Sequence, residues 1–156
     1  MTKTGFENIQ TEIHRLWHIE RPEIVRQVTA AAELGDRSEN GAYIYGKKRL
    51  REIDSRLRYL RKKTEGIVVV DVTDQVPHDD VRFGAIVKVV DDNDIEKTWR
   101  MVDKDESEPK RQRISVQSPI GQALMGKEVG DYITVTLPKG KIGLEILEIR
   151  YGNDGP

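Results

Sequence analysis

The sequence contains no cysteine among its 156 residues, and only 6% of its residues are aromatic. Without cysteine, a disulfide, a zinc–thiolate centre and thiol catalysis are all excluded. Long apolar runs are lacking too, because none approaches the roughly 20 residues that a membrane-spanning helix needs. No apolar stretch follows residues 1–4 that could act as a signal peptide. We therefore expect a soluble cytoplasmic protein.

Histidine is also scarce, and the three histidines form no ligand cluster in the sequence. His14 and His18 have the spacing that shares one helix face and can bind a metal, but no third ligand is evident. We expect these two and His78 to be surface residues. Ser38 and Ser118 have no histidine base nearby in the pattern, and helix capping accounts for both.

Charged side chains are abundant instead, making up 34% of the chain against 37% hydrophobic residues. This balance indicates a large solvated surface over a modest core, as on a projecting helical arm. The net charge is only −1, which conceals a strong segregation of sign along the chain. A chain of this length suits one ordinary domain or two small ones.

Two long helical patterns fill the first part of the chain. In residues 5–34, apolar side chains recur at three- and four-residue spacing, and Pro22 predicts a kink or a fresh helix start near residues 20–21. Residues 38–64 carry a second apolar seam, in which Gly46 is expected to be a weak point. The short connection makes the helices antiparallel neighbours, and about 27 residues at roughly 1.5 Å each give an arm on the order of 40 Å long.

Beyond Gly66 the pattern changes to the two-residue period of strands. A helix from Ser118 and Pro119 to Gly126 interrupts it. Strands are predicted at residues 67–72, 84–90, 95–102, 112–116, 132–137 and 142–149, with loops at 73–80 and 103–111. The predicted fold class is therefore α+β. An N-terminal antiparallel α-helical coiled-coil hairpin covers residues 1–73, and a C-terminal antiparallel β-sheet domain with one short helix covers residues 74–156.

The connection between the helices, residues 34–40, holds two carboxylates three residues apart. One interpretation of Asp36 and Glu39 is a capping box that satisfies free amides at the start of the second helix. The other is metal coordination, because paired carboxylates suit a hard cation such as Mg²⁺. Two carboxylates do not complete a Mg²⁺ site, so water, substrate phosphate or another protein would supply the remaining ligands. The residues alone leave both interpretations open.

The second helix is strongly basic, and only Glu52 and Asp54 oppose nine cationic residues. One interpretation is a solvated helix surface with pairs such as Glu52–Arg56. The other is phosphate binding, because the positive excess is too large to be paired within the helix. Tyr43 is expected in the seam, whereas Tyr45 is expected to be exposed and able to stack on a base. The nine cationic residues are Lys47, Lys48, Arg49, Arg51, Arg56, Arg58, Arg61, Lys62 and Lys63.

These motifs resemble the B-type branch of the bacterial Gre transcript-cleavage factors over nearly the whole chain. The matching stretches are residues 20–23, 34–40, 43, 47–54, 118–119, 123–124 and 126–131. The resemblance implies a hairpin that enters the secondary channel of RNA polymerase, and a C-terminal domain with an FKBP-like fold that docks on the channel rim. It also implies an accessory factor rather than an enzyme, one that rescues arrested complexes by stimulating cleavage of backtracked RNA 3′ ends.

The same resemblance implies residue roles. Asp36 and Glu39 match the family's tip acids, which help the polymerase's own aspartates hold a second Mg²⁺ for hydrolysis of the RNA. Mg²⁺ would then be shared with the polymerase rather than bound tightly by this chain alone, and the free protein is expected to be a monomer. Asn40 and Tyr43 would support the tip. The RNA-binding positions would be Lys47, Lys48, Arg49, Arg51, Arg56, Arg58 and Arg61, and the polymerase-binding positions Gln117, Ser118 and Pro119.

Three positions depart from the family pattern, namely Gly41, Ala42 and Gln117. The first two stand where alanine and an acid are usual, and the third where the B-type branch has an acid. They favour an alternative, a channel-binding regulator that does not stimulate cleavage.

Two alternatives of other classes have less support in the sequence. A peptidyl-prolyl isomerase would need an aromatic-lined pocket, and the C-terminal half offers only Phe83, Trp99, Tyr132 and Tyr151. A purely structural coiled-coil adaptor would leave the tip acids and the segregated charge without a use.

Overall fold

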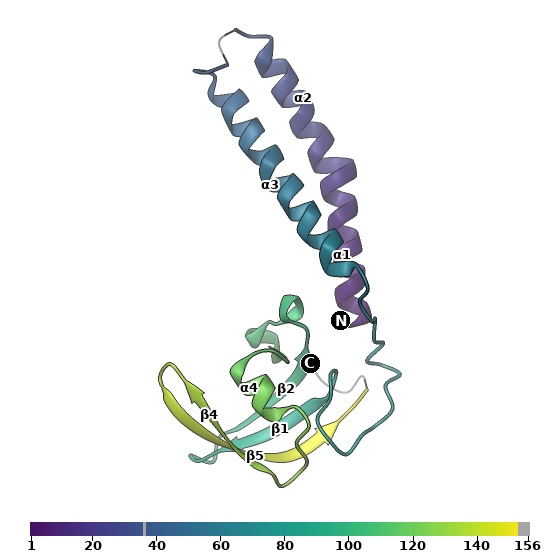
Figure 1. The fold of residues 1–156 in the computed structure, drawn as a ribbon, viewed down its shortest axis with the longest axis vertical. Helices are drawn as coiled ribbons and strands as arrows, with labels where there is room; N and C mark the ends of the chain where they lie inside the picture. Colours follow the sequence, from purple (N-terminus) through teal and green to yellow (C-terminus); the bar gives the residue numbers. More distant parts are fainter. Residues whose placement is uncertain (36, 153–156) are drawn as a thin grey trace. The chain divides into compact units, whose positions relative to one another are not determined.

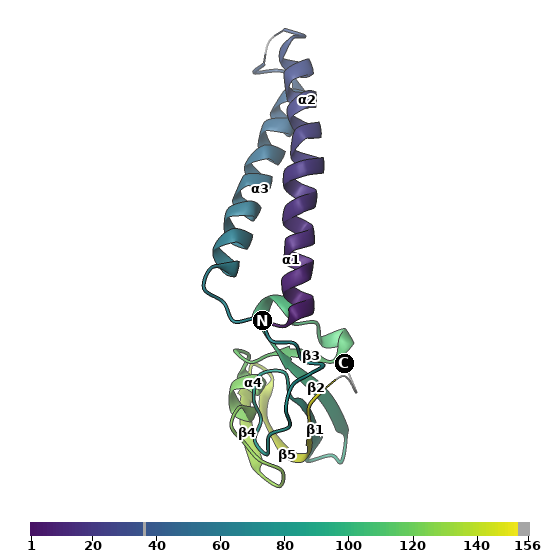
Figure 2. The same ribbon diagram turned by 90° about the vertical axis from the view of Figure 1, so that its right-hand side faces the viewer.

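The structure, a computed structural model, describes residues 1–35 and 37–152. The chain forms two compact units (Figures 1 and 2). One, the helical arm, comprises residues 6–67, and the other comprises residues 1–5 with the chain from residue 68 onward. The fold class is α+β, as predicted. The division between the units falls earlier than residue 73, and the first five residues group with the sheet rather than with the hairpin.

The first helical pattern forms three consecutive elements. Helix α1 (Lys3–Arg15) leads into a π-helix, η1 (Leu16–Glu20), which leads into α2 (Arg21–Ala32). The amide of Arg21 donates to the carbonyl of Leu16, five residues back. Pro22 has no N–H, so the α-helical hydrogen bond to the carbonyl of His18 cannot form, and a wider π turn lies at this point. The predicted kink or fresh start is thus a π-helix within a continuous helical run.

Helix α3 (Gly41–Thr64) runs antiparallel to α2, and the two lie side by side in both ribbon views (Figures 1 and 2). Its buried residues are Gly46, Ile53, Leu57 and Leu60. A Cβ added at Gly46 would overlap the Cγ2 of Val28. The prediction that Gly46 is a weak point was therefore wrong, because the absence of a side chain lets the two helices approach closely.

The second unit contains a five-stranded sheet with the order β3-β2-β1-β5-β4. Its strands are β1 (Ile86–Asp91), β2 (Glu96–Val102), β3 (Arg113–Ser115), β4 (Tyr132–Leu137) and β5 (Gly140–Arg150). The β1–β2 and β4–β5 hairpins were predicted, but β3 pairs parallel with β2, so the sheet is mixed and not antiparallel. A parallel pair needs a crossover. The predicted loop 103–111 provides it with two 3₁₀ turns, Lys104–Glu106 and Pro109–Arg111.

Helix α4 (Pro119–Leu124) begins where the sequence predicts and ends before the predicted stop at Gly126, and its Leu124 belongs to the core of this unit. Val87, Val89, Met101, Leu124 and Ile146 are fully buried there. No helix in the described ranges is both long and apolar enough to cross a membrane.

The predicted strand at residues 67–72 does not form. Val70 makes one isolated parallel bridge to Thr2, while Val68 is 75% exposed. The amide of Val70 donates to the carbonyl of Met1, and the amide of Lys3 donates to the carbonyl of Val70. A run of β-branched residues favours extended backbone, but a strand also needs a partner along its length.

Candidate functional site

The turn of the helical arm connects the end of α2 at Ala32 with the start of α3 at Gly41 (Figure 1). Leu34, Gly35 and Glu39 are exposed in this turn. Gly35 has a φ of 126°, a conformation that a residue with a side chain adopts only under strain. Asp36, the first of the two predicted tip acids, lies outside the described residues. The site is therefore built from its neighbours.

Asn40 ties the two helices together at the turn. Its side-chain Oδ1 accepts a hydrogen bond from the amide of Tyr43 at 3.1 Å, which makes it the N-cap of α3. Its Nδ2 donates to the carbonyl of Ala31 at 2.8 Å, near the end of α2. One side chain thus satisfies a free amide at the start of one helix and adds a hydrogen bond to a carbonyl in the last turn of the other. The predicted role of Asn40 in supporting the tip has this contact as its physical basis.

For Glu39, the described member of the pair, the capping-box interpretation is wrong. Helix α3 begins at Gly41, after both acids, and Asn40 takes the N-cap position. Glu39 lies in a turn and is exposed, so its carboxylate is outside the helix that it was predicted to cap. Such a carboxylate can offer oxygen ligands to a hard cation.

Tyr43 and Arg37 lie against each other beside the turn. The Arg37 guanidinium carbon is 5.6 Å from the centroid of the Tyr43 ring, and Tyr43 is half-buried. Both residues line a shallow hollow of about 400 Å³, together with Val28, Thr29, Ala32 and Glu33. A cation–π contact at such a partly exposed site contributes about 0.5–1 kcal/mol. Tyr45, by contrast, is 64% exposed, as predicted.

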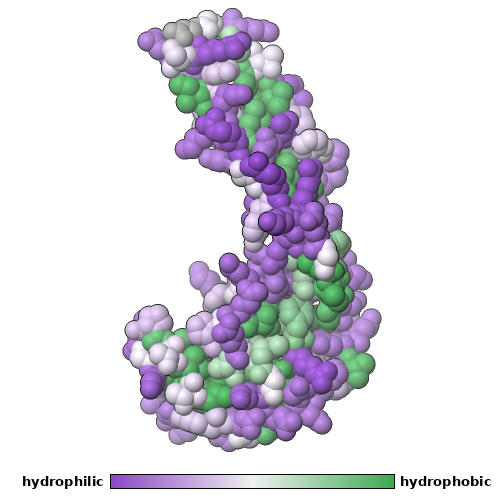
Figure 3. All heavy atoms as spheres, viewed as in Figure 1, coloured by the Kyte–Doolittle hydropathy of each residue, from purple (hydrophilic) through white to green (hydrophobic). Residues whose placement is uncertain are grey.

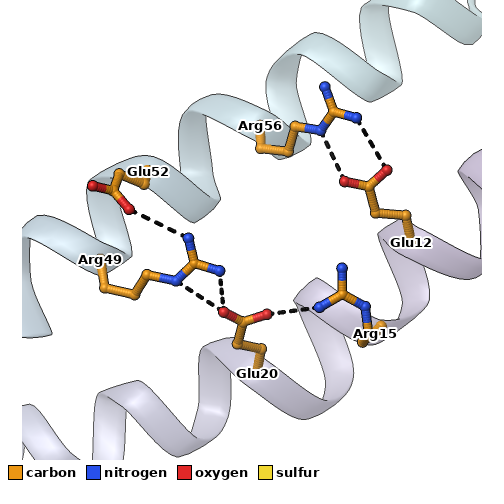
Figure 4. A network of polar contacts seen from close by, with 6 residues as sticks. All are labelled: Glu12, Arg15, Glu20, Arg49, Glu52 and Arg56. Carbon is orange, nitrogen blue, oxygen red and sulfur yellow. Dashed lines mark hydrogen bonds and ion pairs between the residues drawn. The ribbon is translucent and has the colours of Figure 1, made fainter. Parts of the chain in front are cut away.

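An ion-pair network joins the two sides of the arm (Figure 4). Arg49 Nε donates to Glu20 Oε1 at 2.8 Å, and Arg49 Nη1 lies 3.3 Å from Glu52 Oε2. Arg15 reaches the other oxygen of Glu20 at 2.9 Å. The hydrogen bond to Glu20 is the main reason that the pKa of Arg49 is raised above its ordinary value. Glu20 therefore holds two guanidinium groups, one from each side of the arm.

A bidentate pair lies further along the same face (Figure 4). Arg56 donates from Nε and Nη2 to the two oxygens of Glu12, at 2.8 and 3.1 Å. The hydrogen bond from Arg56 is the main cause of the lowered pKa of Glu12. The sequence suggested a Glu52–Arg56 pair within α3, whereas Arg56 binds Glu12 across the arm and Glu52 pairs with Arg49.

The basic residues of α3 consequently fall into two groups. Arg49 and Arg56 bind carboxylates of the first helix, although both were predicted to bind RNA. Arg56 is nevertheless exposed, as are the predicted RNA-binding residues Lys47, Lys48, Arg51 and Arg58. Arg61 is also exposed, and its guanidinium carbon lies 5.2 Å from the centroid of the Trp17 ring. Hydrophilic side chains dominate much of the arm in the space-filling view (Figure 3).

Glu12 and Glu20 are the residues of this face that sequence reasoning missed. A weak signal was present, since the two acids are eight residues apart and their partners Arg56 and Arg49 are seven apart. Both spacings correspond to about two helical turns, so the acids share a face and the arginines share a face. The pairs could not be assigned without the register between the antiparallel helices.

The three predicted polymerase-binding residues lie at the start of α4. Gln117 and Pro119 are exposed. Ser118 is the N-cap, and its Oγ accepts from the amide of Gly121 at 3.0 Å and donates to the carbonyl of Ser115 at 2.7 Å. The hydroxyl of Ser118 thus fixes the local backbone, and the exposed neighbours offer the surface.

Two family models match almost the entire chain. The model described as "Transcription elongation factor, N-terminal" matches residues 1–69, and the model described as "Transcription elongation factor, GreA/GreB, C-term" matches residues 76–151.

Curated relatives are similar over nearly the whole length. Transcription elongation factor GreB of Yersinia pestis is 46% identical over 151 residues, which cover 97% of this chain and 88% of that protein. GreB of Pseudomonas aeruginosa is 43% identical, covering 97% of this chain and 89% of that protein. Among solved structures, the Gfh1 protein of Thermus thermophilus aligns with a TM-score of 0.42 at 22% identity, over 96% of this chain and 97% of that one.

Proposed function

Because the chain belongs to the GreA/GreB family of transcription elongation factors, we propose that it binds RNA polymerase and stimulates the polymerase's own cleavage of backtracked RNA. In this role the chain is an accessory factor. It brings carboxylates to an active site that lies on the polymerase, and it forms no complete active site of its own.

The observation that carries the proposal is the position of Glu39. This acid lies on the exposed turn at the end of a two-helix arm, and Asn40 fixes that turn by bonding to both helices. A hairpin that enters the secondary channel of the polymerase would present this turn first. Glu39 and its neighbour Asp36 would then reach the catalytic centre together.

Asp36 and Glu39 would hold a Mg²⁺ ion jointly with aspartates of the polymerase. Such an ion, when bound, supplies Lewis-acid stabilisation and lowers the pKa of a bound water. The chain's own contribution is to place two oxygen ligands and to keep them oriented. The freedom of Glu39 from the capping of α3 supports this role, because its carboxylate is not engaged at the helix start.

The exposed basic residues Lys47, Lys48, Arg51 and Arg58 would contact the phosphates of the extruded RNA 3′ segment. Contacts of this kind attract RNA without reading its sequence and weaken as salt rises. Arg49 and Arg56 would contribute mainly by holding the two sides of the arm together, because both bind carboxylates across it. Gln117 and Pro119, with Ser118 bracing the backbone between them, would contact the rim of the channel.

The test is RNA cleavage in a halted, backtracked polymerase complex after the protein is added. Asp36→Asn and Glu39→Gln should each abolish the stimulated cleavage while binding to the polymerase persists. Glu33→Gln is a matched control, because Glu33 is an exposed acid that precedes Gly35, and it should retain activity. Without polymerase, the protein should release no RNA fragments.

The same assay separates the alternatives. If the double variant still rescues backtracked complexes, the proposed metal role of the tip acids is wrong. If the wild-type protein binds polymerase but adds no cleavage, the chain is a channel-binding regulator, as the departures at Gly41, Ala42 and Gln117 would favour.

A further inference from the structure

His14 and His18 form a pair that the proposed function does not use. His14 lies near the end of α1 and His18 lies in the π-helix η1, and both are exposed. Their ring centroids are 4.7 Å apart, with 37° between the ring planes. The two imidazole rings therefore lie next to each other on the exposed face of the helix.

The centroid distance matches what a chelated metal requires. A divalent metal binds imidazole nitrogen at about 2.0–2.1 Å, and two such bonds at about 90–110° place the ring centroids roughly 4.5–5.2 Å apart. The observed 4.7 Å lies inside this range. To bind a metal, the exposed rings would turn about their side-chain torsions so that one nitrogen of each faces the ion.

The neighbouring cations do not oppose a bound metal strongly. Arg15 and Arg21 flank the histidines in the sequence, and each is paired with a carboxylate. Arg15 lies 2.9 Å from Glu20, and Arg21 lies 2.9 Å from Asp54. Glu20 also binds Arg49, so the charge of Arg15 is only partly offset, whereas Asp54 offsets that of Arg21, and exposure to water screens what remains.

We propose that His14 and His18 chelate a divalent transition metal of the Zn²⁺, Ni²⁺ and Cu²⁺ class. Imidazole ligands suit these ions, and the order of affinity should place Cu²⁺ first. Within the described ranges no group of three or more His, Cys, Asp or Glu residues gathers as metal ligands, so water completes the coordination sphere here. This chemistry differs from that of the tip, where carboxylates suit Mg²⁺.

A metal bound in this way would join α1 to the π turn that precedes Pro22. At that turn the α-helical hydrogen bond of Pro22 is missing, because proline has no N–H to donate. A chelate across it would slow local opening of the helix, and this effect requires neither polymerase nor RNA. The proposal therefore stands or fails independently of the transcript-cleavage role.

The experiment titrates the full chain with ZnCl₂ or NiCl₂ alone and follows binding by calorimetry and by the imidazole NMR signals. One metal should bind, with shifts at His14 and His18. His14→Gln and His18→Gln should each weaken the affinity at least about tenfold, because a chelate that loses one imidazole keeps a single ligand. Glutamine has a helix propensity at least as good as that of histidine, so the helix should survive.

The matched control is His78→Gln, because His78 lies in the other unit with its ring edge-on to Tyr151 at 5.5 Å. This variant should bind the metal like the wild type, and MgCl₂ should shift neither His14 nor His18. Amide exchange over residues 14–19 should slow when the metal is bound. Unchanged affinity in both single variants, or exchange that ignores the metal, would overturn the proposal.

Discussion

Replacing Asn40 with alanine would remove both hydrogen bonds that fix the turn of the arm. Loss of an N-cap asparagine costs about 0.5–2 kcal/mol, and loss of a further hydrogen bond to a backbone carbonyl costs about 0.5–1.5 kcal/mol. The bonds concerned run from the Tyr43 amide at 3.1 Å and to the Ala31 carbonyl at 2.8 Å. Asn40→Ala should therefore destabilise the arm by roughly 1–3 kcal/mol.

Asn40→Asp separates the two contributions. Aspartate keeps an oxygen that accepts from the Tyr43 amide, and its charge suits a helix N-terminus, but it cannot donate to Ala31. We expect this variant to lose only the contribution of the Ala31 bond. Urea unfolding followed by the helical circular dichroism signal measures the loss in free energy, and amide exchange at Tyr43 reports the cap directly.

The functional assay then decides whether the bonds of Asn40 position the tip. Both variants should bind polymerase, and cleavage stimulation should fall in Asn40→Ala more than in Asn40→Asp. The reasoning is refuted if Asn40→Ala unfolds at the wild-type urea concentration and exchanges the Tyr43 amide at the wild-type rate.

Two further predictions concern the arm itself. Gly46→Ala should destabilise the arm, because the new Cβ would overlap Val28. Gly41→Ala should stabilise it by up to about 1 kcal/mol, because its Cβ would meet nothing within 4 Å. Thermal unfolding of the two variants measures both changes in stability, and equal effects would contradict the packing argument. Glu12→Gln should lower stability by at most about 1 kcal/mol, and by less at high salt, because its pair with Arg56 is partly exposed. The pKa of Glu12 lies below its ordinary value of 4.5, so the stability that its carboxylate contributes is present above that pH and is lost as the pH falls through the lower folded value. Urea unfolding between pH 3 and 7, about the range where carboxylates titrate, should show the wild type and Glu12→Gln converging at the acid end.

Features that depend on local sequence were predictable. The two helices, the two β hairpins and the start of α4 at Pro119 follow from hydrophobic spacing, turn residues and capping residues, and the structure contains all of them. The motif also predicted that the connection between the helices holds the tip acids, of which Glu39 is exposed in the turn and Asp36 lies outside the described residues. The motif did not give the position of the cap, because three consecutive polar residues, Ser38, Glu39 and Asn40, precede the helix. The structure shows that Asn40 is the N-cap and bonds to both helices.

Features that depend on contacts distant in the sequence were missed. Residues 67–72 read as a strand from composition, but they have a single bridge, from Val70 to Thr2. The parallel pairing of β3 with β2 depends on how residues 103–112 turn, which no local period encodes. The partners of Arg49 and Arg56 depend on the register between two helices, so the sequence did not show that both arginines pair with carboxylates across the arm.

The π-helix η1 also changes how residues along the arm should be counted. A π turn holds about one residue more than an α turn. Each residue after it therefore lies on the helix face that a regular α-helix would give to the preceding residue number. A heptad drawn from Ile9 through Leu16 therefore loses phase before it reaches Ala31, although all three side chains are buried. A homologous arm that is one residue shorter within positions 16–20 could keep the same face buried, and an alignment gap there would mark a straightened turn, not a lost contact.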